Sequence, residues 1–302
     1  MRPLNPIHQT GDSLEYYRAL SWICVLGVLA FLIWITFAPN GFPGAPVVAC
    51  LMGGSTLAAL RLGAPASAPY WQSAAEPAQA PRVAQMIMVC LVVQTFVWAA
   101  QMLAEATYLP QLASMSYGAT SDVVWTAIFL VFIGTRYVKW PKRVASPSKT
   151  DFIATAAIAV VLMSVLNLVT VMLYDGQRVE LSLARFTTVI PALFFKAVIE
   201  EVFFRVLLLT ALIQASRSSN HALILSSVAF ALMHVPGVFL QPLLEMDYSL
   251  LRYNAEEYAP RFVWQLGIGF ALGALWLRTG SIVLIVTMHA IFNFAPVWLT
   301  GL

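Results

Sequence analysis

The sequence predicts an all-α membrane protein, a polytopic bundle of eight or nine transmembrane helices. Of the 302 residues, 60% are hydrophobic and 10% are charged, and the mean hydropathy is +0.79. Soluble domains average about 25% charged residues. Several apolar runs reach about 20 residues, which is the length that a helix needs to cross ~30 Å of hydrocarbon. A soluble fold could not bury this much apolar surface, so we expect the chain to lie in a lipid bilayer.

Apolar runs between polar or proline-rich breaks give the expected spans in chain order. These are Ala19–Ala38, Ala45–Leu60, Val83–Leu103, Val123–Val138, Phe152–Tyr174, Thr187–Ile213, His221–Leu240, Phe262–Leu277 and Ile282–Leu302. The first run is long and is followed by no small-residue cleavage site, so we expect it to be a retained span. The second run is short and contains Gly53-Gly54, which leaves eight spans plus a re-entrant segment as the alternative.

The basic residues predict the orientation in the membrane. With a cytoplasmic N-terminus, eleven basic residues fall inside: Arg2, Arg18, Arg61, Arg82, Arg136, Lys139, Lys142, Arg143, Lys149, Arg217 and Arg278. Four fall outside: Arg178, Arg185, Arg252 and Arg261. The positive-inside rule therefore predicts a cytoplasmic N-terminus and, with nine spans, an external C-terminus. Because the basic residues are spread along the chain, no nucleic-acid partner is expected.

Two polar segments divide the chain. Residues Gly63–Arg82 are rich in proline and alanine and predict a flexible connector, and the basic segment Arg136–Lys149 contains Pro141 and Pro147. We therefore expect one integral membrane domain over residues 1–302. Residues 1–150 would supply accessory spans, and residues 151–302 would form a core of about four helices that carries the chemistry.

Polar residues inside three late spans point to a functional site, because ionisable side chains are costly in a bilayer and mark sites or water-filled paths. The sixth span carries Lys196, Glu200, Glu201 and Arg205, the seventh carries His234, and the ninth carries His289 and Asn293. Residues four apart share one face of a helix. Glu201 and Arg205 can therefore neutralise each other, which leaves Glu200 for other work, and His289 and Asn293 point the same way.

A carboxylate and an imidazole at one point can hold and deprotonate a water molecule. Further hydrogen-bond donors can stabilise the oxyanion that forms when this water attacks an amide carbonyl. The residue set is therefore sufficient for hydrolysis without a covalent nucleophile.

These residues stand in three strings, EEVFFR at 200–205, FALMH at 230–234 and HAIFN at 289–293. In order, the strings resemble the E-E-x-x-x-R, F-x-x-x-H and H-x-x-x-N motifs of the CAAX prenyl endopeptidase and bacteriocin-processing (CPBP) family of glutamic-type intramembrane proteases. The resemblance covers about Thr187–Asn293. Many members of this family have glycine after the motif arginine, whereas Val206 stands here, which puts tight helix packing at that point in doubt.

The resemblance implies a role for each motif residue. Glu200 would be the catalytic glutamate, His234 would help it to activate water, and His289 and Asn293 would form the oxyanion site. Glu201 and Arg205 would form a supporting ion pair, and Phe230 would pack beside the site. No cofactor is implied.

Simpler interpretations exist for single residues. His234 and Asn293 could be hydrogen-bonding bridges between helices. Lys196 lies one turn before Glu200 and is expected to extend towards the outer membrane interface, with an influence on the Glu200 carboxylate as the alternative. The acidic and tyrosine-rich segment Gln241–Arg261 is expected to be a solvated connector, with a substrate-docking flap as the alternative.

Other protease chemistries fit the sequence less well. The H-E-x-x-H string of zinc proteases is absent, although a divalent metal such as zinc held by Glu200 and the two histidines is an alternative. Tyr174-Asp175 lacks the second aspartate of the presenilin-like pattern, and Ser55 fits a rhomboid-like serine poorly.

The predicted function is an intramembrane endopeptidase that cuts a membrane-anchored or amphipathic peptide or protein in contact with the bilayer. One alternative is a membrane binding or chaperone protein of the same fold without catalysis. The other is a small proton-coupled transporter that uses Glu200 and the histidines as a relay, although it should show an internal repeat or paired broken helices. The compact loops favour a bacterial inner (plasma) membrane, with the endoplasmic-reticulum membrane as the alternative.

Overall fold

The computed structural model describes residues 11–37, 71–72, 79–106, 117–143, 145–173, 183–236, 239–240, 243, 246 and 248–300. The helices are α1 Gly11–Phe37, α3 Gln79–Ala106, α5 Tyr117–Gly134, α6 Lys149–Leu173, α7 Leu183–Glu201, η1 Val202–Leu209, α8 Thr210–Ser216, α9 Ser219–Leu232, α11 Tyr248–Thr279 and α12 Ile282–Thr300. The strands β1 Trp71–Gln72 and β2 Lys142–Arg143 form an antiparallel ladder of two residues each.

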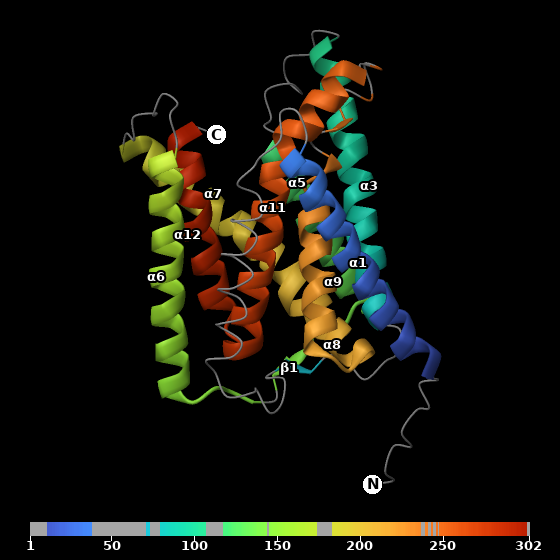
Figure 1. The fold of residues 1–302 in the computed structure, drawn as a ribbon, viewed down its shortest axis with the longest axis vertical. Coiled ribbons are helices and arrows are strands. Elements are labelled where there is room, and N and C mark those ends of the chain that lie inside the picture. Colours follow the sequence, from blue (N-terminus) through green and yellow to red (C-terminus); the bar gives the residue numbers. More distant parts are fainter. Residues whose placement is uncertain are drawn as a thin grey trace.

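The described part of the chain is therefore all-helical apart from this small ladder, as predicted (Figure 1). Helices correspond to eight of the nine expected spans, and the Ala45–Leu60 run lies outside the described residues. By length and composition, two described helices could cross a membrane, through Glu15–Ile33 and Gln79–Leu103, and shorter apolar helices run through Thr120–Gly134, Ser219–Leu232 and Ile282–Phe294. Two such helices support membrane insertion weakly, so the number of spans stays a prediction.

The prediction of a solvated connector over Gln241–Arg261 is wrong for most of this segment. Helix α11 begins at Tyr248 and continues without interruption to Thr279. The acidic residues and tyrosines of this stretch suggested a solvated loop, but residues 248–259 contain neither proline nor glycine. A helix that is already stabilised by the packing of its apolar C-terminal half can extend through such a polar stretch.

The helix that carries the first motif contains a π-helical segment. α7, η1 and α8 follow one another directly from Leu183 to Ser216, and η1 between them has π geometry. All eight residues of η1 are buried. π-Helical turns inside α-helices are rare and often occur at functional sites, because they change which side chains face the same direction.

Helices α9 and α11 pack closely against each other. A Cβ atom added at Gly269 would lie 3.2 Å from the Cα of Ser227 on α9, and one at Gly273 would lie 2.4 Å from the Cδ1 of Leu223. Glycines four apart allow two helix backbones to approach each other, as in the GxxxG packing of membrane helices. This contact fixes the helix that carries the second motif.

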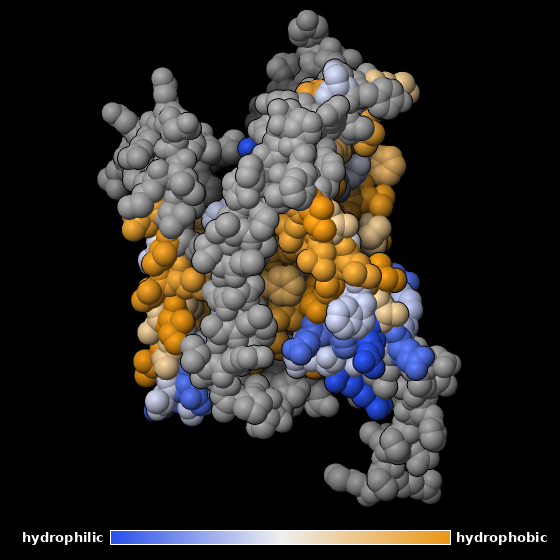
Figure 2. Space-filling model, in the orientation of Figure 1, coloured by the Kyte–Doolittle hydropathy of each residue, from blue (hydrophilic) through white to orange (hydrophobic). Residues whose placement is uncertain are grey.

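Large apolar side chains cover much of the outer surface of the described helices. Ile23, Leu26 and Ile33 on α1 are each more than 60% exposed, as are Phe96 on α3 and Ile153 on α6. Figure 2 shows this surface as an apolar band with hydrophilic residues below it at the lower end of the molecule. Contiguous exposed apolar surface of this kind is typical of an interaction with lipid or with another protein.

Candidate active site

The acidic pair of the first motif lies at the junction of α7 and η1, in the interior. Glu200 is 5% exposed and Glu201 is fully buried. Buried carboxylates need partners, because an unpaired charge away from water is very costly. Both carboxylates find their partner in the same imidazole.

His289 on α12 lies between the two glutamates. Its Nδ1 is 2.7 Å from Oε1 of Glu201, and its Nε2 is 3.4 Å from Oε2 of Glu200. A carboxylate only accepts hydrogen bonds, so the ring donates from Nδ1 to Glu201. The second proton, when present, can be directed from Nε2 to Glu200 or to a substrate atom that comes between them.

Arg205 balances this negative charge from within η1. One terminal nitrogen lies 3.1 Å from Oε1 of Glu201, and the guanidinium carbon lies 4.2 Å from the centre of the Phe230 ring. The guanidinium is almost completely buried. Oε2 of Glu201 and both terminal nitrogens of Arg205 nevertheless make no hydrogen bond of good geometry with the described residues. Unsatisfied groups of this kind are rare in interiors and mark places where function constrains the structure.

His234 lies one turn after Phe230, at the end of α9, and its ring packs against that phenylalanine with the ring centres 5.1 Å apart. Its Nδ1 is 3.0 Å from the backbone carbonyl oxygen of Phe230. Because a carbonyl only accepts, Nδ1 carries the proton and the neutral ring keeps a free lone pair on Nε2. Glu200 lies within electrostatic range of this ring. His234 is thus in a tautomer that can accept a hydrogen bond from water.

The remaining predicted residues lie around this cluster. Phe230 also contacts His289, with the ring centres 5.8 Å apart. Asn293 follows His289 by one turn of α12 and is half-buried. Lys196 places its ammonium 3.9 Å from Oε1 of Glu200, although 46% of its side chain is exposed. The ammonium thus lies near Glu200 while much of the side chain stays exposed, which fits the interpretation that Lys196 influences this carboxylate.

Sequence reasoning missed three features of the cluster. The first is the hydrogen bond between Glu201 and His289, because motif spacing pairs residues within one helix and not between helices. The others are Asp122 on α5 and Tyr258 on α11, which lie within electrostatic range of Glu200. Asp122 directly precedes the expected span Val123–Val138. An ionisable residue at the edge of a span could have been recognised as a candidate from the sequence.

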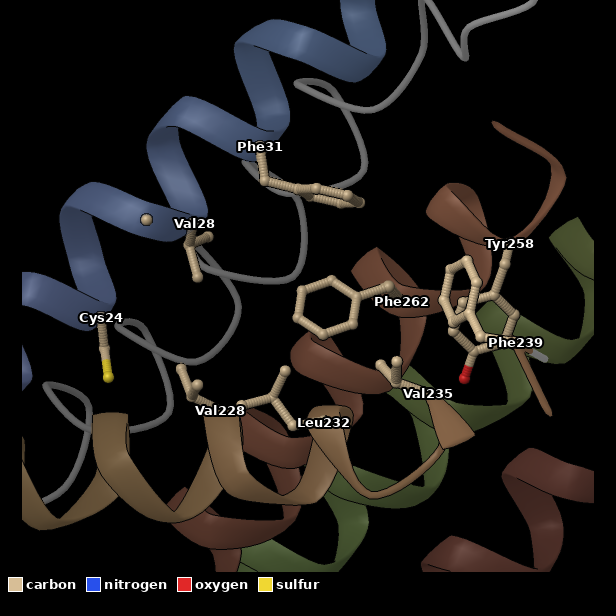
Figure 3. Close-up of a pocket in the computed structure, with 10 residues that line it drawn as sticks. Cys24, Val28, Phe31, Val228, Leu232, Val235, Phe239, Tyr258 and Phe262 are labelled. Carbon is tan, nitrogen blue, oxygen red and sulfur yellow. The ribbon is translucent and has the colours of Figure 1, made fainter. Parts of the chain in front are cut away.

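An apolar pocket of about 340 Å³ lies beside the cluster, between α1, α9 and α11. Figure 3 shows Val28 and Phe31 of α1 facing Leu232, Val235 and Phe262 across this space. Val235 directly follows His234, and Tyr258 lines the pocket at the same end. The pocket is therefore lined at one end by the residue that follows His234 in the chain.

Among the described residues, no three histidine, cysteine, aspartate or glutamate side chains form a group that could hold a metal ion. Glu200, His234 and His289 are the residues that the metal alternative requires. In the structure, both nitrogens of His289 face carboxylates.

Comparison with known proteins agrees with this geometry. Residues 182–295, from α7 to most of α12, match the family model described as type II CAAX prenyl endopeptidase Rce1-like. The match contains all three motifs. No curated protein and no solved structure matches the chain. Residues 182–295 therefore form an Rce1-like domain of the type II CAAX prenyl endopeptidase kind, which confirms the resemblance to the CPBP proteases.

Proposed function

We propose that the chain is a glutamic-type intramembrane endopeptidase, which hydrolyses a peptide bond of a membrane-associated substrate with a water molecule activated by Glu200 and His234. The observation that carries this proposal is the imidazole of His289 between the two glutamates, 3.4 Å from Glu200 and 2.7 Å from Glu201. It puts a carboxylate base and a hydrogen-bond donor at one buried point.

In the proposed mechanism Glu200 takes a proton from a water molecule, which His234 holds through its Nε2 lone pair. The resulting hydroxide attacks the scissile carbonyl, and the oxyanion of the tetrahedral intermediate accepts hydrogen bonds from Nε2 of His289 and from the amide of Asn293. Glu200 then returns its proton to the leaving amine. A peptide inserted between Glu200 and His289 would replace their mutual contact. Nε2 of His289, which faces Glu200 in the structure, would then donate to the oxyanion of the substrate.

We place this chemistry inside a bacterial inner (plasma) membrane, in a bundle of eight or nine spans with a cytoplasmic N-terminus. The exposed apolar surface of α1, α3 and α6 and the distribution of basic residues support this setting. Residues 151–302 would be the catalytic core, and the matched region 182–295 lies within it. Residues 1–150 would supply accessory spans.

The substrate in this proposal is a membrane-anchored or amphipathic peptide. The apolar pocket that Val235 lines next to His234 supports it, because this space of about 340 Å³ between Val28, Leu232 and Phe262 could hold an apolar group of the substrate. Burying such a group would contribute about 25 cal/mol for each Å² of apolar surface.

The test compares the purified protein with Glu200→Gln, His234→Ala and His289→Ala variants. Each is incubated in detergent with the membrane peptides of a bacterial host, and new termini are identified by mass spectrometry. We expect each variant to lose at least 100-fold in cleavage rate, because general acid–base catalysis contributes about 10²–10⁴-fold and an oxyanion donor such as His289 contributes about 10²–10³-fold. Asp151→Asn, the same chemical change at an exposed carboxylate of α6, should cleave normally.

Equal product formation by all these proteins would disprove the peptidase proposal. Treatment with a chelator tests the alternative that the site holds a metal ion. We expect full activity after treatment with a chelator, and a loss that zinc restores would show that Glu200 and the histidines hold a metal.

A further inference from the structure

A second, polar pocket lies away from the catalytic cluster, where the first turns of α1 meet the turn between α8 and α9. Its volume is about 490 Å³. The residues that line it come from α1 and from this turn: Glu15, Arg18, Trp22, Ser216, Arg217, Ser218 and His221. Figure 2 shows hydrophilic residues at this lower end, directly below the apolar band. None of the lining residues takes part in the proposed hydrolysis.

The charges in this pocket favour an anion. Arg18 and Arg217 are both exposed, and neither guanidinium forms an ion pair with another residue of the described ranges. Glu15 is the one carboxylate among the lining residues, so the two arginines outnumber it. Ser218 caps α9 and accepts from the backbone N–H of His221, so the positive end of this helix also faces the pocket.

A partly buried hydrogen bond joins α1 and α9 at the pocket. The hydroxyl of Ser21 on α1 donates to the carbonyl of Arg18 at 2.8 Å and lies 2.6 Å from Nδ1 of His221 on α9. Because the Ser21 hydroxyl donates its proton to the Arg18 carbonyl, Nδ1 of His221 donates to the Ser21 oxygen. Because α1 also packs against α8 and α9, Arg18 and Arg217 are presented by a fixed frame.

The surface next to the pocket is apolar. Trp22 lines the pocket with more than half of its surface exposed, and Ile23 and Leu26 continue the exposed apolar face of α1. Tryptophan is enriched where the hydrocarbon of a membrane meets the headgroups. The predicted topology places Arg18 and Arg217 on the cytoplasmic side, where the leaflet carries anionic lipids.

We infer that this pocket binds the phosphate of an anionic phospholipid headgroup, with the acyl chains along the exposed face of α1. The guanidinium groups of Arg18 and Arg217 donate to the phosphate oxygens, in the charge-assisted geometry that arginine forms with phosphate. The lipid bridges α1, which lies outside the matched region, to the turn before α9, the helix that leads to His234. The inference depends on the membrane setting proposed above and not on peptidase activity.

The experiment titrates dioctanoylphosphatidylglycerol into the purified full-length protein in detergent and measures the thermal unfolding midpoint. Dioctanoylphosphatidylcholine is the neutral lipid control, and inorganic phosphate is the soluble anion control. The test variant is Arg18→Gln/Arg217→Gln. Its matched control is Lys142→Gln/Lys149→Gln, which removes the same charge from exposed residues of the same predicted side.

We expect a saturable rise of the midpoint with phosphatidylglycerol and none with phosphatidylcholine. Each arginine should contribute ~5-fold in affinity, so that the double variant binds about 25-fold more weakly. The lysine control should bind within about twofold of the unchanged protein. If the double variant does not fold, Arg18→Gln and Arg217→Gln are compared singly, and Arg217→Lys should recover most of the affinity.

Three results would overturn the inference. Equal stabilisation by the two lipids would show that the headgroup charge is not recognised. An equal loss in the lysine control would show attraction to the whole surface and not to the pocket. Binding of inorganic phosphate with the affinity of phosphatidylglycerol would assign the pocket to a soluble anion. Each result is obtained without a peptidase assay, so it is independent of whether the chain cleaves peptides.

Discussion

At the scale of single residues, Glu200 and Glu201 are neighbours in sequence but have different surroundings. Glu201 is fully buried and contacts Arg205 and Nδ1 of His289, whereas Glu200 faces Nε2 of His289 and the half-exposed Lys196. Glu201 thus orients the imidazole and neutralises the guanidinium, and Glu200 is the carboxylate that we propose to activate water.

Changing Glu201 to Gln should therefore affect folding more than chemistry. The amide leaves the buried charge of Arg205 uncompensated, and breaking a buried pair in this way costs about 3–5 kcal/mol. We expect a clearly lower thermal unfolding midpoint in detergent. Glu200→Gln should lower the midpoint much less, because Glu200 lies further from Arg205 and has a partner at the edge of the site.

The double variant Glu201→Gln/Arg205→Met separates the two roles. It removes both charges together, so most of the lost stability should return. Cleavage should stay low, because His289 no longer has an ionised partner at Nδ1. Recovery of cleavage together with stability would show that Glu201 serves only the ion pair.

The sequence was sufficient to select these residues, because motif spacing and the cost of charges in apolar helices both single them out. It could not predict the contacts between helices. Lys196 reaches Glu200 from the same helix, yet its long side chain could equally extend to the surface, and only packing decides between the two. The bond from Glu201 to His289 joins residues 88 positions apart, and no local pattern encodes that contact.

At the scale of helices, the contact between α9 and α11 can be tested with glycine substitutions. The Cβ of Gly269→Ala would lie 3.2 Å from the backbone of Ser227, which must shift as a unit, whereas that of Gly273→Ala meets the end of the flexible Leu223 side chain. Overpacking costs about 1–3 kcal/mol. We expect the unfolding midpoint to fall for both, and more for Gly269→Ala.

Gly134→Ala is the matched control, because nothing lies within 4 Å of the added Cβ. Gly269→Ala should also slow cleavage, since a displaced α9 moves Phe230 and His234. A larger effect at Gly273 than at Gly269 would contradict this account of the packing.

Most helices could be predicted from apolar runs, because helices that are buried or that face an apolar environment consist mainly of apolar residues. Two features could not. The polar first half of α11 lacks an apolar run, so its helical form depends on continuity with the packed half. The π-helical segment of η1 has no signature in VFFRVLLL, because the extra residue per turn is stabilised by the surrounding core and not by local preference.

At the scale of the whole molecule, the apolar pocket is lined by residues from inside and from outside the matched region. Cys24, Gly27, Val28 and Phe31 of α1 form one wall, although α1 lies outside the matched region. The opposite wall belongs to α9 and α11, beside His234. If the pocket takes an apolar group of the substrate, α1 contributes to substrate selection and does not merely anchor the core.

Substituting Gly27 by Leu tests this contribution. Nothing lies within 4 Å of a Cβ at this position, the remaining carbons face the apolar pocket that Gly27 lines, and leucine favours a helix more than glycine. The unfolding midpoint should therefore be unchanged or slightly higher. The new side chain fills part of the pocket, so KM should rise for substrates with a bulky apolar group next to the cleaved bond.

One missing methylene contact in such a pocket changes discrimination by about 10-fold or more, so we expect kcat/KM to fall by at least that factor while kcat stays within about twofold. Gly27→Ala adds a single carbon and should have a small effect in the same direction. Cleavage by Gly27→Leu with an unchanged KM would show that the substrate does not enter between α1 and α9. A fall in kcat alone would instead indicate that α1 acts on the catalytic cluster through the position of α9.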